Sequence, residues 1–286
     1  MIRQLLARRN RTRSGRVSIA IGLGLLALIG AACAFYPLFT SASPAELVAA
    51  PFSAPSSAHP FGTDEVGRDV LVRTLDGGRL DILVSLATVL ASMVLGTVVG
   101  TIAGYSKSLV VDTVISRLID AVIAFPFIVL ILALIVVFGQ ERQFGPLPPG
   151  LPATVAAFIL VGWVYYARLA RSQTMALRNR DYIVATRVMG YSRRRTVFKH
   201  VIPQVLRVTL SYSVLDVLMF VLLLASLSFV GASVQPPNAE WGAIIYGGRA
   251  YLEDAWWITA MPGAVLILFG ISLTLLADGL VARGED

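Results

Sequence analysis

Long apolar runs alternate with short polar segments along most of the chain. The runs lie at about residues 17–39, 82–105, 112–138, 153–166 and beyond, 206–230, and 258–276. About 20 apolar residues are enough for a helix to cross the roughly 30 Å hydrocarbon core of a bilayer. The pattern therefore predicts an all-α, polytopic membrane protein with about six transmembrane helices.

Composition supports this class and removes others. The 286 residues are 56% hydrophobic and 14% charged, whereas soluble domains carry about 25% charged residues. The formal net charge of +7 would indicate a nucleic-acid partner in a soluble chain. In a membrane protein, lysine and arginine collect on cytoplasmic loops. Membrane topology therefore explains the net charge, and we expect the chain to contact a lipid bilayer and no nucleic acid.

The basic residues also predict the orientation. Nineteen of the 24 Lys and Arg fall in the segments expected inside and five in those expected outside, which places both termini in the cytoplasm. The basic start and first apolar run also resemble a cleaved signal, but the run is long enough to span and more spans follow. The expected division is a basic cytoplasmic N-terminus over residues 1–17, a first transmembrane helix over 18–40, an external loop with an amphipathic segment over 41–80, and a five-helix core over 81–280 that includes a cytoplasmic loop over 170–204.

The cytoplasmic loop carries the strongest local signals. Ten of the 24 Lys and Arg lie between residues 168 and 207. Asp181 is expected to cap a short helix and Gly190 to end it in a left-handed turn. Ser192 is expected to cap a second helix, and Pro203 to mark the start or a kink of the next one.

The first of these short helices has apolar residues on nearly all sides, including Ile183, Val184 and Val188. Such a helix needs cover on both faces. We therefore expect it to lie between the membrane domain and another protein. The alternative is a basic loop that only determines membrane topology.

The same segment resembles the cytoplasmic coupling loop of ABC-importer permeases. The pattern D-Y-x-x-A-x-R-x-x-G-x-S-x-x-R-x-x-x-x-H-x-x-P is similar to the dipeptide, oligopeptide and nickel branch of that family, and three of its residues also match the family's stricter form. The resemblance implies that the following residues couple the chain to an ATPase: Asp181, Tyr182, Ala185, Arg187, Gly190, Ser192, Arg195, His200 and Pro203.

Two further blocks resemble the C-type subunit of the same branch. They are HPFGTDEVGRDVLVRTLDGGRLDI at residues 59–82 and LSFVGASVQPPNAEWGAII at residues 227–245. Relatives often carry glutamate where this chain has Leu224, which leaves the role of that position open. The first block is either an interfacial amphipathic turn or a contact surface for an external binding protein, for which the candidates are Asp64, Arg68, Asp69 and Trp241.

Local chemistry adds several expectations around these blocks. Thr63 or Asp64 is expected to cap a helix, Asp69 to pair with Arg73, and Gly77-Gly78 to redirect the chain into the membrane.

A glycine repeat and a proline are expected to shape two of the transmembrane helices, and an acid marks a candidate translocation path. Gly96, Gly100 and Gly104 would bare one helix face for close packing, and Pro126 would kink the third span. Asp216 lies inside a predicted span, where desolvating an acid is expensive, so it is either a candidate for the translocation path or a partner of a nearby group.

The chain lacks the residues of an enzyme. It has no G-x-x-x-x-G-K-[ST] loop, no convincing catalytic set and no cysteine-rich metal site, since Cys33 is its one cysteine and His59 and His200 lie far apart. We therefore expect no catalytic residue, no metal and no cofactor on this chain.

The resemblance implies a type I ABC importer permease in a bacterial cytoplasmic membrane. It further implies a second, non-identical permease, two ATPase subunits that hold ATP and magnesium, and an external solute-binding protein. Di- and oligopeptides are the expected cargo, with nickel or another small solute left open. A secondary transporter or channel-type protein is the alternative function, followed by an intramembrane enzyme.

Overall fold

The computed structural model describes residues 2–40, 42–106, 108–139, 147–232, 234 and 237–284. Helices joined by loops make up this part of the chain, with two isolated β-bridges. The helices are α1 (Ile2–Phe35), η1 (Tyr36–Leu38), α2 (Val70–Tyr105), α3 (Leu109–Ile123), α4 (Phe127–Phe138), α5 (Leu151–Leu177), α6 (Asp181–Val188), α7 (Arg193–Thr196), the π-helical turn η2 (Val197–Val201), α8 (Ile202–Phe229), α9 (Trp241–Gly248), η3 (Arg249–Tyr251) and α10 (Trp257–Gly284).

The number of membrane-length helices agrees with the apolar pattern. Within the described residues, five helices are long and apolar enough to cross a membrane, and the count rises to six if the bent pair α3–α4 forms one span. This confirms the all-α prediction. In the structure α1 includes the basic residues 2–17, and α2 begins at Val70, within the segment that was expected to be external.

The chain divides into two compact units. One comprises residues 1–86, 139–152 and 214–286, and the other comprises residues 87–138 and 153–213. We call them the first and the second unit and describe each by itself.

The glycine repeat of α2 organises the second unit. A Cβ atom added at Gly96 would collide with the carbonyl oxygen of Trp163, and one at Gly100 with that of Ala167. At Gly104 it would lie 2.6 Å from the carbonyl oxygen of Arg171. The repeat therefore lets α2 and α5 approach backbone to backbone, as the spacing predicts.

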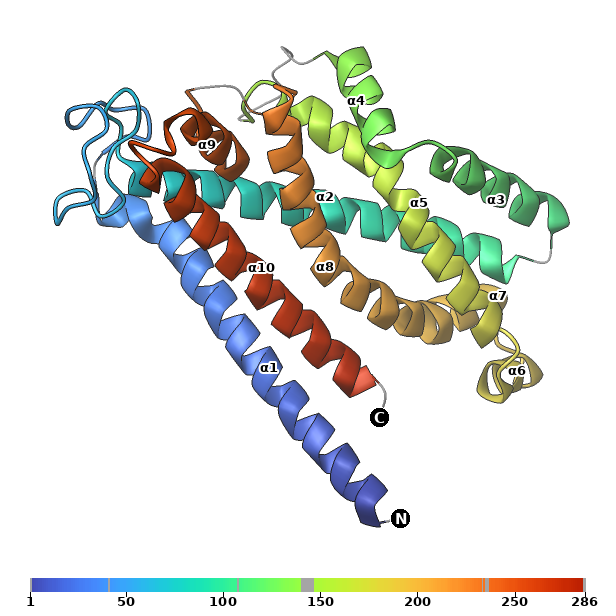
Figure 1. Ribbon diagram of the computed structural model, residues 1–286. Coiled ribbons are helices and arrows are strands. Elements are labelled where there is room, and N and C mark those ends of the chain that lie inside the picture. Colours follow the sequence, from blue (N-terminus) through green and yellow to red (C-terminus); the bar gives the residue numbers. More distant parts are fainter. Residues whose placement is uncertain are drawn as a thin grey trace. The chain divides into compact units, whose positions relative to one another are not determined.

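Pro126 marks a break rather than a mild kink. The axes of α3 and α4 differ by 92° across residues 124–126, and Figure 1 shows the turn between these two green helices. Proline lacks the backbone N–H that a continuous helix needs. Phe127, at the start of α4, then packs edge-on against Phe158 and Tyr165 of α5.

In the first unit, α1 runs beside α10, as the blue and red helices of Figure 1 show. Small residues make the contact possible. A Cβ atom at Gly22 would lie 2.7 Å from the carbonyl oxygen of Ser272, and one at Gly279 would meet Ile19 and Gly15. Close packing of this kind holds helices together in a bilayer, where the hydrophobic effect does not drive helices to associate because lipid tails are as apolar as the side chains.

The start of α2 differs from the expectation. Asp69 caps the helix, with Oδ1 accepting from the N–H groups of Leu71 at 2.8 Å and Val72 at 3.0 Å. The helix then continues through Gly77-Gly78 without a redirection. These glycines instead make room for residues 240 and 241, because a Cβ atom would meet the Glu240 backbone at Gly77 and the Trp241 ring at Gly78.

Glu240 and Trp241 attach α9 to α2. The indole N–H of Trp241 donates to the Thr74 carbonyl at 2.8 Å, and its backbone N–H donates to Asp81 Oδ2 at 3.1 Å. Glu240 caps α9 by accepting from the N–H groups of Gly242 and Ala243, each at 2.7 Å, and it accepts from the Ser228 hydroxyl at 2.7 Å. Burial raises the pKa of Glu240, and these three hydrogen bonds offset part of the rise.

A glycine substitution tests the contact between α2 and α5. Gly100→Ala places a methyl group against the Ala167 backbone and is expected to lower the free energy of unfolding by about 1–3 kcal/mol, the usual cost of overpacking. Gly24→Ala is the matched control, because an added Cβ atom meets nothing within 4 Å at that position in α1. Thermal unfolding in detergent measures both variants, and equal melting temperatures would contradict the contact.

The buried carboxyl group predicts a pH effect with a definite sign. A pKa raised in the folded state means that the native protein holds the Glu240 proton more tightly than the unfolded chain does. Stability should therefore fall as pH rises above the unfolded value of about 4.3. Melting temperatures measured over about pH 4.5 to 8 should show this slope.

The slope should be shallower in Glu240→Gln, because an amide does not ionise in this range. Glu253→Gln is the control, since Glu253 is an exposed glutamate. Slopes that are the same for the wild type and Glu240→Gln would refute the assignment.

Candidate functional site

The helix α6 (Asp181–Val188) has one buried and one exposed face. Ile183 and Thr186 are buried, whereas Tyr182 is 42% and Val188 is 84% exposed. Met189, directly after the helix, is 63% exposed. The sequence predicted a helix that needs cover on both faces, and the second unit supplies cover on one.

The buried face is held by the ends of several helices. Ile183 packs in a cluster with Ala170 of α5, Val201 of the π-helical turn and Val205 of α8, and Tyr105 at the end of α2 packs against it. The Tyr182 hydroxyl donates to Gln204 Oε1 at 2.9 Å. Ile183 of α6 therefore packs against the ends of α5 and α2, the π-helical turn and the start of α8.

Gly190 ends α6 as predicted. Its φ of +78° lies in the left-handed region. Its N–H donates to the Arg187 carbonyl at 3.0 Å, and the N–H of Tyr191 donates to the Thr186 carbonyl at 3.0 Å. These two bonds form a Schellman motif, which glycine adopts without a Cβ clash.

The next two capping predictions have different outcomes. Ser192 caps α7, since its hydroxyl accepts from the Arg195 N–H at 3.3 Å. Asp181 does not cap α6. The capping position belongs to Arg180, whose side chain makes no cap bond, and Asp181 is the first helical residue. There its negative charge still suits the positive end of the helix dipole.

Pro203 lies in the first turn of α8, directly after a π-helical turn. The Ile202 N–H donates to the Val197 carbonyl, five residues back. The wider turn occurs where proline removes a backbone donor. His200 lies within it, and its Nε2 is buried with no hydrogen-bond partner. The predicted helix start at Pro203 is therefore correct to within one residue.

Arginines surround the segment, and aromatic rings position them. The Arg195 guanidinium lies 4.1 Å from the centre of the Tyr191 ring, and that of Arg187 lies 5.4 Å from the Tyr105 ring. Arg187 also donates to the Arg178 carbonyl at 3.2 Å. The predicted coupling residues thus occupy one continuous surface segment, with most of their side chains exposed.

The ion pair Asp112–Arg171 was not predicted. Arg171 Nε lies 2.6 Å from Asp112 Oδ1 and its Nη2 lies 2.8 Å from Oδ2. This bidentate pair links α3 to α5. Both residues were expected near the inner surface, but nothing in their spacing of 59 residues indicated a contact.

The external candidates lie in a loop held together by charge. Arg68 Nε contacts Asp64 Oδ2 at 2.6 Å, and Asp69 Oδ2 contacts His59 Nδ1 at 2.8 Å. The acid paired with Arg73 is Asp64, at 3.5 Å, rather than the predicted Asp69. Asp69 is turned toward His59 and the start of α2, which explains the difference.

Burial corrects part of the external assignment. Trp241 is fully buried and Asp64 is 2% exposed, so neither offers its side chain to an external protein in this structure. Arg68 is partly exposed and Asp69 is 9% exposed. Asp216 lies in α8 and is half-buried, and Leu224, where relatives often carry an acid, is buried.

Glu240 is a buried acid that lies outside the α6 site and to which the sequence assigned no role. It belongs to the third resembling block. Its neighbours Gly77 and Ser228 come from other segments, so the buried acid became recognisable only with the fold.

Comparison with known proteins places these features in a family. The family model described as binding-protein-dependent transport system inner membrane component matches residues 96–284. The di/tripeptide transport system permease protein DppC of Pseudomonas aeruginosa is 35% identical over 227 residues, which cover 77% of this chain and 69% of that protein. The probable D,D-dipeptide transport system permease protein DdpC of Escherichia coli is 34% identical, over 79% of this chain and 72% of that protein.

A putative peptide permease protein of Brucella suis is 34% identical over 95% of this chain and 87% of its own length. The inward-facing MetNI methionine ABC transporter has a similar fold, with a TM-score of 0.57 at 17% identity, over 72% of this chain and 93% of that chain. The family match includes α5, α6 and α8, which carry the candidate site. The chain therefore belongs to the family of binding-protein-dependent transport system inner membrane components.

Proposed function

We propose that this chain is the permease subunit of an ATP-driven ABC importer of di- or oligopeptides, and that it forms the translocation path with a second permease. The exposed face of α6 carries the proposal. Tyr182, Val184, Val188 and Met189 are between 42% and 84% exposed, although Ile183 on the other face is fully buried. An apolar helix face of this kind fits a groove on a partner protein.

The partner of this face is a cytoplasmic ATPase subunit. Arg194 and Arg195 beside the face would attract an acidic surface. Two such subunits would hold ATP and magnesium, since the sequence of this chain has no G-x-x-x-x-G-K-[ST] phosphate-binding loop. Family membership favours this assignment over a secondary transporter.

The cluster beneath α6 would transmit movement of the ATPase subunits to the membrane helices. When the ATPase subunits close, they would push on Tyr182 and Val188, and Ile183 would pass the displacement to Ala170, Val201 and Val205. Packed clusters of this kind move as bodies because they deform little. The helix ends would then rock between inward-facing and outward-facing states, as alternating access requires.

Orientation and assembly complete the proposal. With α6 in the cytoplasm, both termini are cytoplasmic, in the inner membrane of a bacterium, and the loop around Asp64, Arg68 and Asp69 is external. An external solute-binding protein would dock on that loop. Trp241 would act behind it, by anchoring α9, rather than by touching the partner.

The cargo follows from the relatives' names. They are described as permeases for dipeptides, di- and tripeptides, and peptides. Nickel or another small solute is the alternative cargo. Asp216 is the candidate for the translocation path, because an acid is costly to keep inside a membrane-length helix.

A substitution at Gly190 tests the coupling role. Valine at φ +78° costs about 1–3 kcal/mol in backbone strain and would distort the Schellman turn. The turn is open, with nothing within 4 Å of an added Cβ atom, so the membrane fold should persist. We expect peptide transport per ATP hydrolysed to fall by roughly five- to hundredfold in Gly190→Val.

Gly190→Asn is the matched control, because asparagine tolerates the left-handed region. Both variants are measured as ATP hydrolysis and peptide uptake in proteoliposomes holding the whole transporter. If Gly190→Val transported as much peptide per ATP hydrolysed as the wild type, the segment would not transmit the movement of the ATPase subunits.

The assembly is tested by isolating the chain from its native membrane in mild detergent and identifying what copurifies. We expect an ATPase with a phosphate-binding loop and a second polytopic permease. The isolated transporter should then take up labelled dipeptides only with its binding protein and ATP. Recovery of the chain alone or as a homo-oligomer, across several detergents, would overturn the importer assignment.

A further inference from the structure

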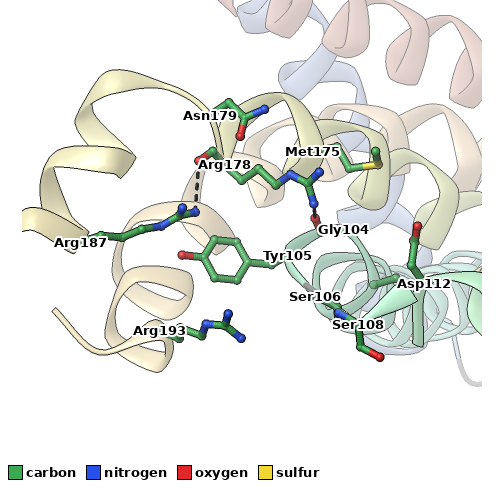
Figure 2. A pocket seen from close by; sticks show the side chains of 11 residues that line it. Gly104, Tyr105, Ser106, Ser108, Asp112, Met175, Arg178, Asn179, Arg187 and Arg193 are labelled. Atoms are coloured by element: carbon green, nitrogen blue, oxygen red, sulfur yellow. Dashed lines mark hydrogen bonds between the residues drawn. The ribbon is translucent and has the colours of Figure 1, made fainter. Parts of the chain in front are cut away.

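A cavity of about 520 Å³ lies beside α6 and is separate from its exposed face. Its walls come from the second unit: the end of α2, the start of α3, the end of α5, and the arginines of α6 and α7. Arg178, Arg187 and Arg193 line it together with Tyr105. Figure 2 shows the Tyr105 side chain between those of Arg187 and Arg193.

Among the described residues that line the cavity, three are arginines and one is an acid, so positive charge exceeds negative charge. Asp112 is the acid that lines the cavity, and its two oxygens are already bound by Arg171. Among the described residues, no Asp or Glu forms an ion pair with Arg178, Arg187 or Arg193. Three cations around one cavity repel one another unless an anion enters.

The cavity also has unused hydrogen-bond donors. Arg178 donates one hydrogen bond to the Gly104 carbonyl at 3.2 Å, and Arg187 donates one to the Arg178 carbonyl. Each guanidinium has five N–H groups. The Tyr105 hydroxyl is buried with no hydrogen-bond partner. Forked donors together with a hydroxyl suit the oxygens of a phosphate group.

The location identifies the source of the phosphate. The membrane-length helices α2 and α5 end at the cavity and α3 begins there, which is the depth of lipid headgroups. Apolar side chains adjoin the lining residues on these helices, with Ile102 55% and Val110 71% exposed. The acyl chains of a lipid would pack on these apolar side chains, whereas a free phosphate ion makes no apolar contacts.

We propose that this cavity binds the phosphate of an anionic phospholipid headgroup, held by Arg178, Arg187, Arg193 and the Tyr105 hydroxyl. Basic pockets at the cytoplasmic ends of membrane helices suit such lipids. The side of the membrane rests on the orientation proposed above, but the binding does not. Bound lipid would also brace Arg187 of α6 against the ends of α2 and α5.

The test measures lipid binding directly and needs no ATP, so it stands apart from the coupling experiment. The whole transporter is delipidated in detergent, phosphatidylglycerol is added back, and native mass spectrometry counts the bound lipid. Arg193→Gln should weaken binding about tenfold, because a charge-assisted hydrogen bond is lost. The Arg193 side chain forms no hydrogen bond or ion pair with another described residue, so its replacement should leave the fold unchanged.

Arg168→Gln is the matched control. Arg168 is exposed and does not line the cavity, so binding should stay within about twofold. Arg178→Gln should weaken binding like Arg193→Gln, and its melting temperature reports any loss of fold.

Three results would overturn the proposal. Equal phosphatidylglycerol binding by wild type and Arg193→Gln would exclude the cavity as the site. Equal binding of phosphatidylcholine and phosphatidylglycerol would exclude recognition of anionic charge. Full displacement of the lipid by millimolar inorganic phosphate would assign the cavity to a free anion instead.

Discussion

The backbone contact between α2 and α5 is the constraint on which the second unit depends. Lipid tails are as apolar as leucine side chains, so helices in a bilayer associate through close packing rather than through hydrophobic burial. Gly96, Gly100 and Gly104 permit that packing. The contact runs to the end of α2 and places Tyr105 where it meets both the cluster beneath α6 and the basic cavity.

The segment proposed to couple to an ATPase combines a firmly held helix with an uncovered face. Hydrogen bonds at Gly190 and Ser192 fix its turn, and Thr186 contacts Thr196 across that turn at 3.2 Å. Below it, Ile183 joins the ends of α5 and α8. Under the proposed function, this close packing would let a partner that binds the exposed apolar face move the helix ends with little local deformation.

The first unit uses buried polar contacts for a different purpose. Glu240 caps α9 and binds Ser228, while Trp241 binds Thr74 and Asp81. Polar groups buried this deeply are costly unless they are paired. The result is a precise attachment of α9 to α2, which explains why Gly77-Gly78 lies where side chains would obstruct it.

The sequence by itself determined the features that depend on residues within about one helical turn. The apolar runs predicted the spans, Pro126 a change of helix direction, Gly190 the left-handed turn and Ser192 a cap, because each of these is decided by local backbone geometry or by hydrophobicity. Resemblance of three motif blocks led to the family that the comparisons then showed.

Only the tertiary structure decided the partners of the charged groups and the burial of individual side chains. Asp69 faces His59 rather than Arg73, and Arg171 binds Asp112 across 59 residues. Trp241 is buried although it was a candidate for contact with an external binding protein. Each outcome depends on groups far away in the chain, whose electrostatic energy is set by distance and desolvation in space. Spacing along the sequence carries no information about either quantity.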